Sequence, residues 1–115
     1  MLKNNRIREI FYYKRFYLDF FENLSLEVRT KLNWTLQLIA TVERVPAKFL
    51  AHIEGSKGLY EIRVKVGRNN YRVFCFFDEG NLIILMNAFL KKTRKTPKNE
   101  LRLANKIKRE YFDEK

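Results

Sequence analysis

Alternation of apolar and charged residues predicts a β-strand with one buried face at residues 59–66. The apolar positions 60, 62, 64 and 66 alternate there with Glu61, Arg63 and Lys65. Two further strands are predicted at 71–77 and 82–90, because turns containing glycine and asparagine separate the three runs. The last run is almost wholly apolar, as expected of a central strand buried on both faces. The pattern therefore predicts an antiparallel meander.

The N-terminal part predicts one strand and two helices. Residues 7–13 are rich in β-forming residues, and 15–22 have the spacing of a short helix. Ser25 fits the N-cap of a longer helix that ends before Pro46. The apolar stripe of that helix is Val28, Leu32, Leu36 and Ile39. Residues between Pro46 and the meander are expected to be irregular.

The C-terminal segment predicts a third helix. Thr96 is expected at its N-cap and Pro97 at its first helical position, and apolar residues recur from Leu101 to Tyr111 at helical spacing. The predicted order is strand, helix, helix, three strands and helix. This is an α+β fold, with residues 1–115 as a single domain whose helical hairpin packs on an antiparallel sheet.

The charge of the chain indicates a polyanionic partner. The 115 residues include 24 Lys and Arg against 13 Asp and Glu, which gives a net charge of +11. A field of that sign attracts RNA, DNA, an anionic membrane or an acidic protein, so it defines a class of partner and not an activity.

The single cysteine and the apolar runs argue against several other classes. Cys75 cannot form an intramolecular disulfide, and its apolar neighbours predict a buried hydrophobic residue. No run approaches the ~20 residues of a membrane span, and charges interrupt any signal-like segment. The expected setting is reducing and cytoplasmic, without membrane association.

Common catalytic motifs are absent from the sequence, and the candidates that remain are cations. There is one histidine, no phosphate-binding loop and no zinc-protease motif, so we expect no cofactor and no metal. RNA carries its own nucleophile, the 2′-OH, and its cleavage needs a proton acceptor, a proton donor and cations on the phosphate. Arginine suits the phosphate, because its planar fork binds two oxygens.

Four cations are expected at one end of the sheet. Arg63 and Arg72 lie on adjacent strands across a short hairpin, and their side chains converge if they share a face. Lys91 and Lys92 leave the end of the third strand beside them. The spacing alone also fits a solvated basic face on an RNA-binding domain.

Three segments resemble the HigB-type toxins of the RelE/ParE superfamily. Residues 58–64 (Gly-Leu-Tyr-Glu-Ile-Arg-Val), 71–74 (Tyr-Arg-Val-Phe) and 88–97 (Ala-Phe-Leu-Lys-Lys-Thr-Arg-Lys-Thr-Pro) are similar to family motifs in the same order. Glu100 and Ala104 match positions in the helix that follows. The resemblance covers roughly residues 52–105.

The resemblance implies a RelE-like fold and a type II toxin that inhibits translation. Such a toxin is a metal-independent endoribonuclease that cleaves mRNA in the ribosomal decoding site. It also implies a cognate antitoxin, usually a helix-turn-helix protein, and contact with operator DNA only through the toxin–antitoxin complex.

By position in the motifs, Arg63, Arg72 and Lys92 match residues of the catalytic site, with Lys91 beside them. Some RelE proteins use a C-terminal tyrosine and a strand lysine, where this chain has Lys98 or a neighbour, and Glu61. The proton acceptor therefore stays open among His52, Glu61 and a lysine. Glu61 fits a salt bridge to a neighbouring cation better than a base, and His52 fits a surface position better than a catalytic one.

Further RNA contacts are expected from residues around the four cations. Tyr71 and Phe89 are candidates for stacking on a base, although a strand phenylalanine also fits the core. Arg94 and Lys95, in the link before the last helix, and Lys65 are candidates for backbone phosphates. The aromatic cluster between Phe11 and Phe21 is interpreted as core and antitoxin contact.

Two other functions stay open on the sequence. A ParE-type toxin shares the fold and acts on DNA gyrase without the RNase residues, so the cations at 63, 72, 91 and 92 argue against it. A non-catalytic RNA-binding module would carry the same charge.

Overall fold

The chain folds into a five-stranded sheet with three helices, in the order expected except for one additional short strand before the meander. The computed structural model describes residues 6–115, and the first five residues of the expected domain lie outside this range. The elements are β1 (Glu9–Tyr12), α1 (Phe16–Glu22), α2 (Leu26–Thr41), β2 (Leu50–His52), β3 (Leu59–Val66), β4 (Asn69–Asp78), β5 (Leu82–Lys91) and α3 (Lys98–Asp113).

The sheet is mixed, with strand order β1-β5-β4-β3-β2. β3, β4 and β5 form the predicted antiparallel meander, and β5 lies between β4 and β1. β1 pairs with β5 in parallel, which corrects the expectation of a wholly antiparallel sheet. The reason is topological: two helices carry the chain from β1 across one face before it re-enters the sheet at the far edge.

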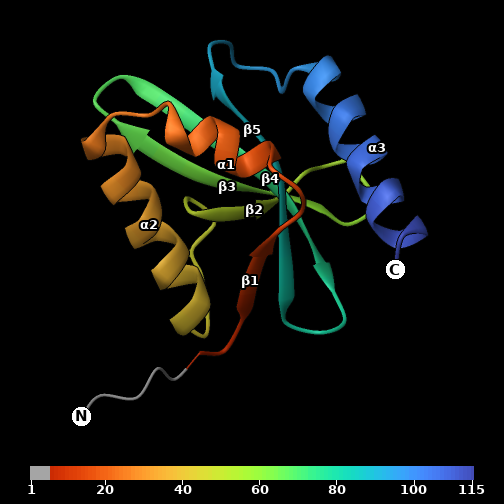
Figure 1. Ribbon diagram of the computed structural model, residues 1–115. Coiled ribbons are helices and arrows are strands. Elements are labelled where there is room, and N and C mark those ends of the chain that lie inside the picture. The colour runs from red at the N-terminus through yellow and green to blue at the C-terminus, as the bar shows by residue number, and fades with distance from the viewer. Residues whose placement is uncertain (1–5) are drawn as a thin grey trace.

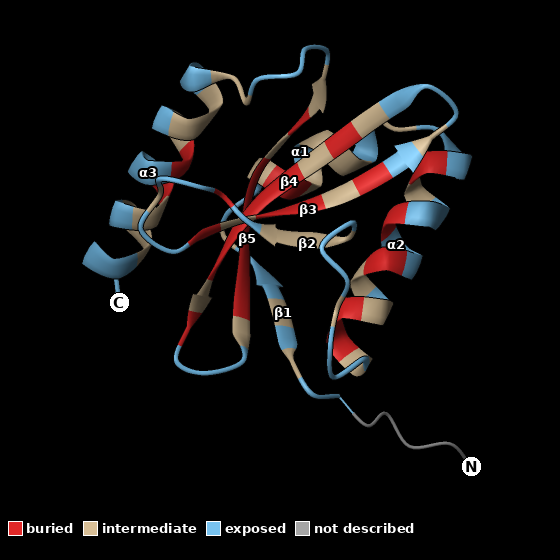
Figure 2. Cartoon of the chain, turned by 180° about the vertical axis from the view of Figure 1, so that it is seen from behind, coloured by how far each residue is buried: buried red, intermediate tan, exposed pale blue. Residues whose placement is uncertain are grey.

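Helices cover both faces of the sheet (Figure 1). α1 and α2 lie on one face, and their buried residues pack with alternate residues of β3, β4 and β5. α3 covers part of the opposite face, where Ala104 and Ile107 pack on Phe74 and Phe76. Figure 2 shows that burial is concentrated in the central strands and on the inner sides of the helices.

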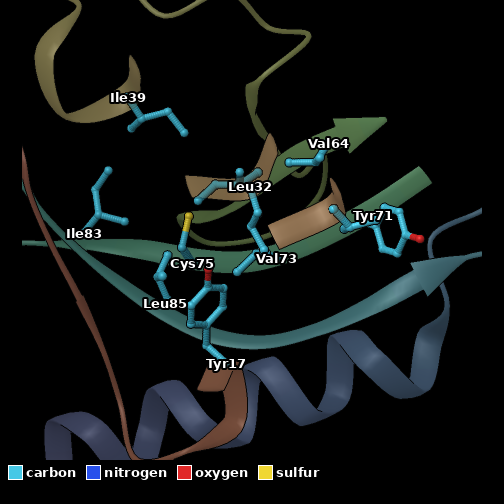
Figure 3. Packing of buried hydrophobic residues seen from close by; sticks show 11 residues of the cluster. Tyr17, Leu32, Ile39, Val64, Tyr71, Val73, Cys75, Ile83 and Leu85 are labelled. Atoms are coloured by element: carbon cyan, nitrogen blue, oxygen red, sulfur yellow. The ribbon is translucent and has the colours of Figure 1, made fainter. Parts of the chain in front are cut away.

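Cys75 is a core residue, as expected. Figure 3 shows it among Leu32, Ile83 and Leu85 in the cluster between the sheet and α1 and α2. Complete burial raises the pKa of its thiol far above the usual range, so it is an inert apolar group.

Local capping signals were partly right. Ser25 caps α2, and its side-chain oxygen accepts from the Val28 N–H at 3.3 Å. The prediction for Thr96 is wrong, because Pro97 occupies the cap position with extended backbone and α3 starts at Lys98.

β2 was not predicted, since its three residues are held by pairing with β3 and have no pattern of their own.

A β-bulge in β5 changes which side chains face α3. Val73 pairs with Ala88, whereas Cys75 pairs with Leu85, so Met86 and Asn87 together oppose Phe74. The extra residue reverses the alternation of β5 from there to its end. Phe89 and Lys91 thereby come to the α3 side of the sheet.

No helix within residues 6–115 is long and apolar enough to cross a membrane.

Candidate functional site

Arg63 and Arg72 lie directly opposite each other on β3 and β4. The Arg63 N–H donates to the Phe49 carbonyl at 2.8 Å, toward β2 and away from β4. The pair with Arg72 is therefore of the non-hydrogen-bonded type, in which opposing side chains stand closest. Both point to the α3 side, beyond the residues that α3 covers. The predicted convergence of these two arginines is confirmed.

Glu61 is the acid that holds the two arginines together. It is only 5% exposed, and its Oε2 accepts from Arg63 Nε at 2.8 Å. Its Oε1 lies 3.7 Å from Arg72 Nε, too far for a hydrogen bond. Neither of these two atoms has a hydrogen-bond partner within residues 6–115. Glu61 thus forms the expected salt bridge, which is complete on the Arg63 side and incomplete on the Arg72 side.

Arg72 is positioned but not fully paired. Its side chain is 13% exposed, and Nη1 donates to the carbonyl of Tyr71 at 3.2 Å. Partial burial lowers the pKa of Arg72 from its usual value, nearby Arg63 lowers it further, and Glu61 opposes both effects. An arginine still carries its charge under these conditions, so a buried cation with unused donors faces the open end of the sheet.

On one side of Arg72 lies a basic hollow of about 830 Å³. Lys91 pairs with Asn70 and reaches the Arg72 side of the sheet because of the bulge. The other cations that line the hollow are Arg68, Lys92 and Arg94. Lys91, Lys92 and Arg94 were expected here. Arg68 and Asn70 were not, although the Gly67–Arg68 turn that presents them is readable from the sequence.

On the other side of Arg72 lies a second hollow of about 510 Å³. Arg63, Lys65 and Arg72 line it together with Lys31 and Lys48. Lys65 thus lies where an RNA-contact residue was expected. Lys31 and Lys48 were missed, because they are distant in the sequence and meet β3 only through the packing of α2 and the pairing of β2.

The structure corrects two expectations, those for Tyr71 and Phe89. Tyr71 is 9% exposed and lies on the opposite face from Arg72, packed with Phe20. Phe89 is opposite Arg72 but 8% exposed, edge-on to Phe74. Both rings belong to the core, so neither offers a face to a base. His52 is exposed, as expected, with its ring edge-on to Tyr60. It also lines a hollow of about 300 Å³ together with Glu61, Arg63 and Lys91, so it stays among the candidate proton acceptors.

Lys95 is exposed in the link before α3, and the structure does not bring it into either hollow. The link is shaped locally by Thr93, whose hydroxyl donates to the Lys95 carbonyl at 3.1 Å.

Within residues 6–115, no three His, Cys, Asp or Glu side chains gather in a way that could hold a metal ion.

Chemically, the arrangement can hold a phosphate, and Arg63 and Arg72 are called the clamp below. Two arginines with free donors stand side by side, and lysines line hollows on both sides. A phosphodiester placed over Arg72 would have the cations of both hollows beside it.

Comparison with known proteins agrees with this fold. A family model described as "Phage derived protein Gp49-like (DUF891)" matches residues 19–109. No curated protein matches the chain.

Two solved structures of RelE toxins are similar to this one. A mutant of the E. coli toxin RelE in the free state has 20% identity and a TM-score of 0.53, over 70% of this chain and 80% of that one. A chain of the archaeal RelE–RelB complex from Pyrococcus horikoshii has 19% identity and a TM-score of 0.54, over 76% of this chain and 98% of that one. The α+β fold is therefore RelE-like.

Proposed function

This chain belongs to the family of phage-derived, Gp49-like proteins (DUF891), and from that premise we propose that it is a toxin that cleaves messenger RNA. The RelE-like fold supports a toxin of a toxin–antitoxin pair. The arginine pair supports RNA cleavage as its activity.

The observation that carries the proposal is the direct cross-strand pairing of Arg63 with Arg72. Like charges in this position destabilise a sheet. One carboxylate, Glu61, lies between them and completes its contact with only one. A bound phosphate would supply the missing negative charge, so the free protein is preorganised for an anion at some expense to its stability.

The proposed reaction uses the nucleophile that RNA carries. The 2′-oxygen attacks the adjacent phosphorus, the bond from phosphorus to the 5′-oxygen breaks, and the products end in a 2′,3′-cyclic phosphate and a 5′-OH. Arg72 and Arg63 hold the non-bridging oxygens, where negative charge builds up in the transition state. Arg72 contributes most, because its stem is fixed in the sheet and its donors are partly unused.

Two proton transfers accompany these steps. Lys91 or Lys92, at the end of β5, gives a proton to the leaving 5′-oxygen. The proton of the 2′-OH goes to Glu61, to His52 or to a lysine in its neutral amine form, because an ammonium group has no lone pair to accept it. Glu61 is nearly covered and bonded to Arg63, which favours one of the other two as the acceptor and Glu61 as the residue that orients the arginines.

We also propose a cognate antitoxin as partner, with messenger RNA on the ribosome as substrate. The structure from Pyrococcus horikoshii is described as a RelE–RelB complex. In this chain the N-terminal aromatic cluster divides in two: Tyr17 is buried, whereas Phe11 and Tyr12 on the edge strand β1 are 57% and 50% exposed. These two rings are the part of the cluster that a partner would cover.

Induction of the chain without an antitoxin tests the proposed function. We expect growth arrest together with new 5′ ends within translated mRNA, mapped across the transcriptome. Arg72→Ala should abolish both. Arg109→Ala is the matched control, because it removes one arginine charge from an exposed position on α3 and should leave both intact.

Arrest with intact mRNA and a DNA-damage response would contradict RNA cleavage and support a gyrase-directed toxin. Arrest that persists unchanged in Arg72→Ala would place the activity elsewhere in the molecule.

A further inference from the structure

An aromatic pair, the exposed Trp34 and the half-buried Phe49, lies beside the basic hollows and outside the two core clusters. Trp34 on α2 is 50% exposed and is the only tryptophan in the chain. Its ring lies edge-on to Phe49, with centroids 5.7 Å apart. The Nζ of Lys48 lies 5.0 Å from the centre of the Phe49 ring. Two rings and a cation are thus gathered on the surface between α2 and the start of β2.

The pair is continuous with the candidate site. A hollow of about 700 Å³ is lined by Trp34, Lys31, Lys65 and Gly67, among others. Lys31, Lys65 and Gly67 also line the hollow that contains Arg63 and Arg72. Lys65 lies two residues from Arg63 along β3, about 7 Å away. A polyanionic strand bound at the two arginines can therefore continue toward Trp34 without leaving the basic surface.

Backbone bonds fix Phe49 in place. Its N–H donates to the Pro46 carbonyl at 2.9 Å, and its carbonyl accepts from Arg63 N–H at 2.8 Å. Arg63 Nη1 also donates to the Ala47 carbonyl at 3.3 Å. The segment that carries Phe49 is therefore tied to the same residue that forms half of the arginine pair, so the rings and the clamp have a set relative position.

The chemistry of this surface fits an unpaired nucleotide. Aromatic rings stack on bases of any sequence, and nearby cations bind the backbone phosphates that join them. Glu27 is the one acid that lines the Trp34 hollow, and it lies at the far end of the surface near the start of α2. An anionic strand with flat bases satisfies the charge and the rings together.

We propose that Trp34 and Phe49 form a stacking site for a base next to the phosphate held by Arg63 and Arg72. This inference deepens the proposed function, because it names a second contact of the same RNA. The site binds an unpaired base without selecting its identity, and Lys31 and Lys48 bind the phosphates on either side of that base.

Fluorescence of Trp34 provides a direct test, since no other tryptophan contributes. The wild-type protein is titrated with a short single-stranded 2′-O-methyl RNA, which keeps its bases but lacks the 2′-OH needed for cleavage. We expect quenching of Trp34 on binding. An abasic oligonucleotide of the same length supplies the same phosphates and should bind more weakly, with little quenching.

Variants test the same site by anisotropy of labelled RNA. Trp34→Ala and Phe49→Ala should each weaken binding by about 5- to 100-fold, the range for loss of one base–aromatic stack. Trp34→Phe keeps a ring and should retain most of the affinity. Phe11→Ala is the matched control for RNA affinity, since it removes a ring of similar exposure (57% against 50% for Trp34) from β1 at the opposite edge of the sheet.

Equal affinity and equal fluorescence with the abasic oligonucleotide would overturn the stacking site. Parallel measurement of mRNA cleavage on ribosomes separates this result from the proposed function. Cleavage without base-dependent quenching leaves the function standing and removes the inference. Base-dependent quenching without cleavage retains the stacking site and removes the function.

Discussion

Two charged residues on the same face of β4, Arg72 and Asp78, have opposite surroundings. Asp78 is 4% exposed and fully engaged: its carboxylate accepts from the Tyr111 hydroxyl at 2.7 Å and pairs with Lys115 at 2.9 Å. Arg72 has a second cation directly opposite and an acid that reaches it only at 3.7 Å. At the Asp78 end of the strand the buried charge is fully paired, and we call this the closed end. At the Arg72 end the charge is incompletely paired, and we call this the open end.

The position of α3 causes the difference. The helix starts at Lys98, where Glu100 accepts from the side chain of Asn87, and it runs over Phe74 and Phe76 to reach Asp78 with its last turn. Arg72 lies beyond the first turn of α3, and its side chain is largely buried but has no hydrogen-bonded acid in the described chain. Arg72 is incompletely paired in the folded protein, so its charge is available for a ligand. Asp78 is paired with groups at the end of α3, so its charge contributes to stability.

The largest expected effect is at the open end. Arg72→Ala should slow single-turnover cleavage by at least about a hundredfold, because a fixed donor acts mainly on the transition state. Ribosome binding should stay nearly intact, and Arg72→Lys should fall between. Cleavage within a few-fold of wild type at saturation would show that Arg72 is not a transition-state residue.

A smaller effect is expected at the bulge that aims Lys91. Asn87 Nδ2 donates to the Glu100 carbonyl at 3.1 Å and to its carboxylate at 2.9 Å. Asn87→Ala should loosen the bulge and slow cleavage roughly tenfold at saturation, with RNA affinity little changed. Glu100→Gln keeps an acceptor oxygen and should preserve the rate. Weaker RNA binding with an unchanged rate at saturation would show that Asn87 does not position Lys91 for cleavage.

The link before α3 should contribute affinity and little rate. Arg94→Ala combined with Lys95→Ala removes two exposed cations, so RNA binding should weaken and its salt dependence should become shallower by up to about two phosphate contacts. Turnover at saturation should change only modestly. The log of the binding constant against the log of salt concentration measures this, and an unchanged slope would remove these residues from the RNA path.

A substitution at the closed end should lower the stability of the protein and leave its rate of RNA cleavage unchanged. Tyr111→Phe removes the hydrogen bond to Asp78 and should lower the unfolding temperature by a few degrees. Single-turnover cleavage should equal that of the wild type. A slower reaction in this variant would mean that the two ends are coupled.

The acid stability of the protein should depend on the same contact. Hydrogen bonds from Tyr111 and then Lys115 hold the pKa of Asp78 below its ordinary value of 3.8. A carboxyl whose folded pKa is lowered stabilises the fold above its unfolded pKa, and this contribution is lost as the pH falls from about 4 toward the folded value. Urea unfolding across that range should show a weaker pH dependence for Asp78→Asn than for the wild type.

The sequence predicted the packed core of the fold better than the candidate site at the open end. Alternation located β3 because half of its residues face a core, and Ser25 was recognised because a cap is a local interaction. β2 and the parallel pairing of β1 were not predictable, since both depend on partners distant in the chain. The bulge also escaped prediction, although Asn87 is the single polar residue inside the apolar run of β5.

The candidate site was predicted where motif residues share a strand pair, as with Arg63 and Arg72. The prediction was wrong where the burial of a side chain decides, as with Tyr71 and Phe89, whose rings belong to the core. Lys31, Lys48 and Trp34 lie on segments that only tertiary packing brings to β3, so no pattern in the sequence singles them out.

The central claim is that RNA is cut by its own 2′-OH at a phosphate held between Arg63 and Arg72. The direct test replaces the nucleotide before the mapped cut with its 2′-deoxy form, in an otherwise unchanged mRNA on the ribosome. We expect wild-type protein to bind this mRNA normally and to leave that bond intact, while the all-ribose control is cleaved to a 2′,3′-cyclic phosphate. Cleavage of the 2′-deoxy bond at the normal rate would contradict the account.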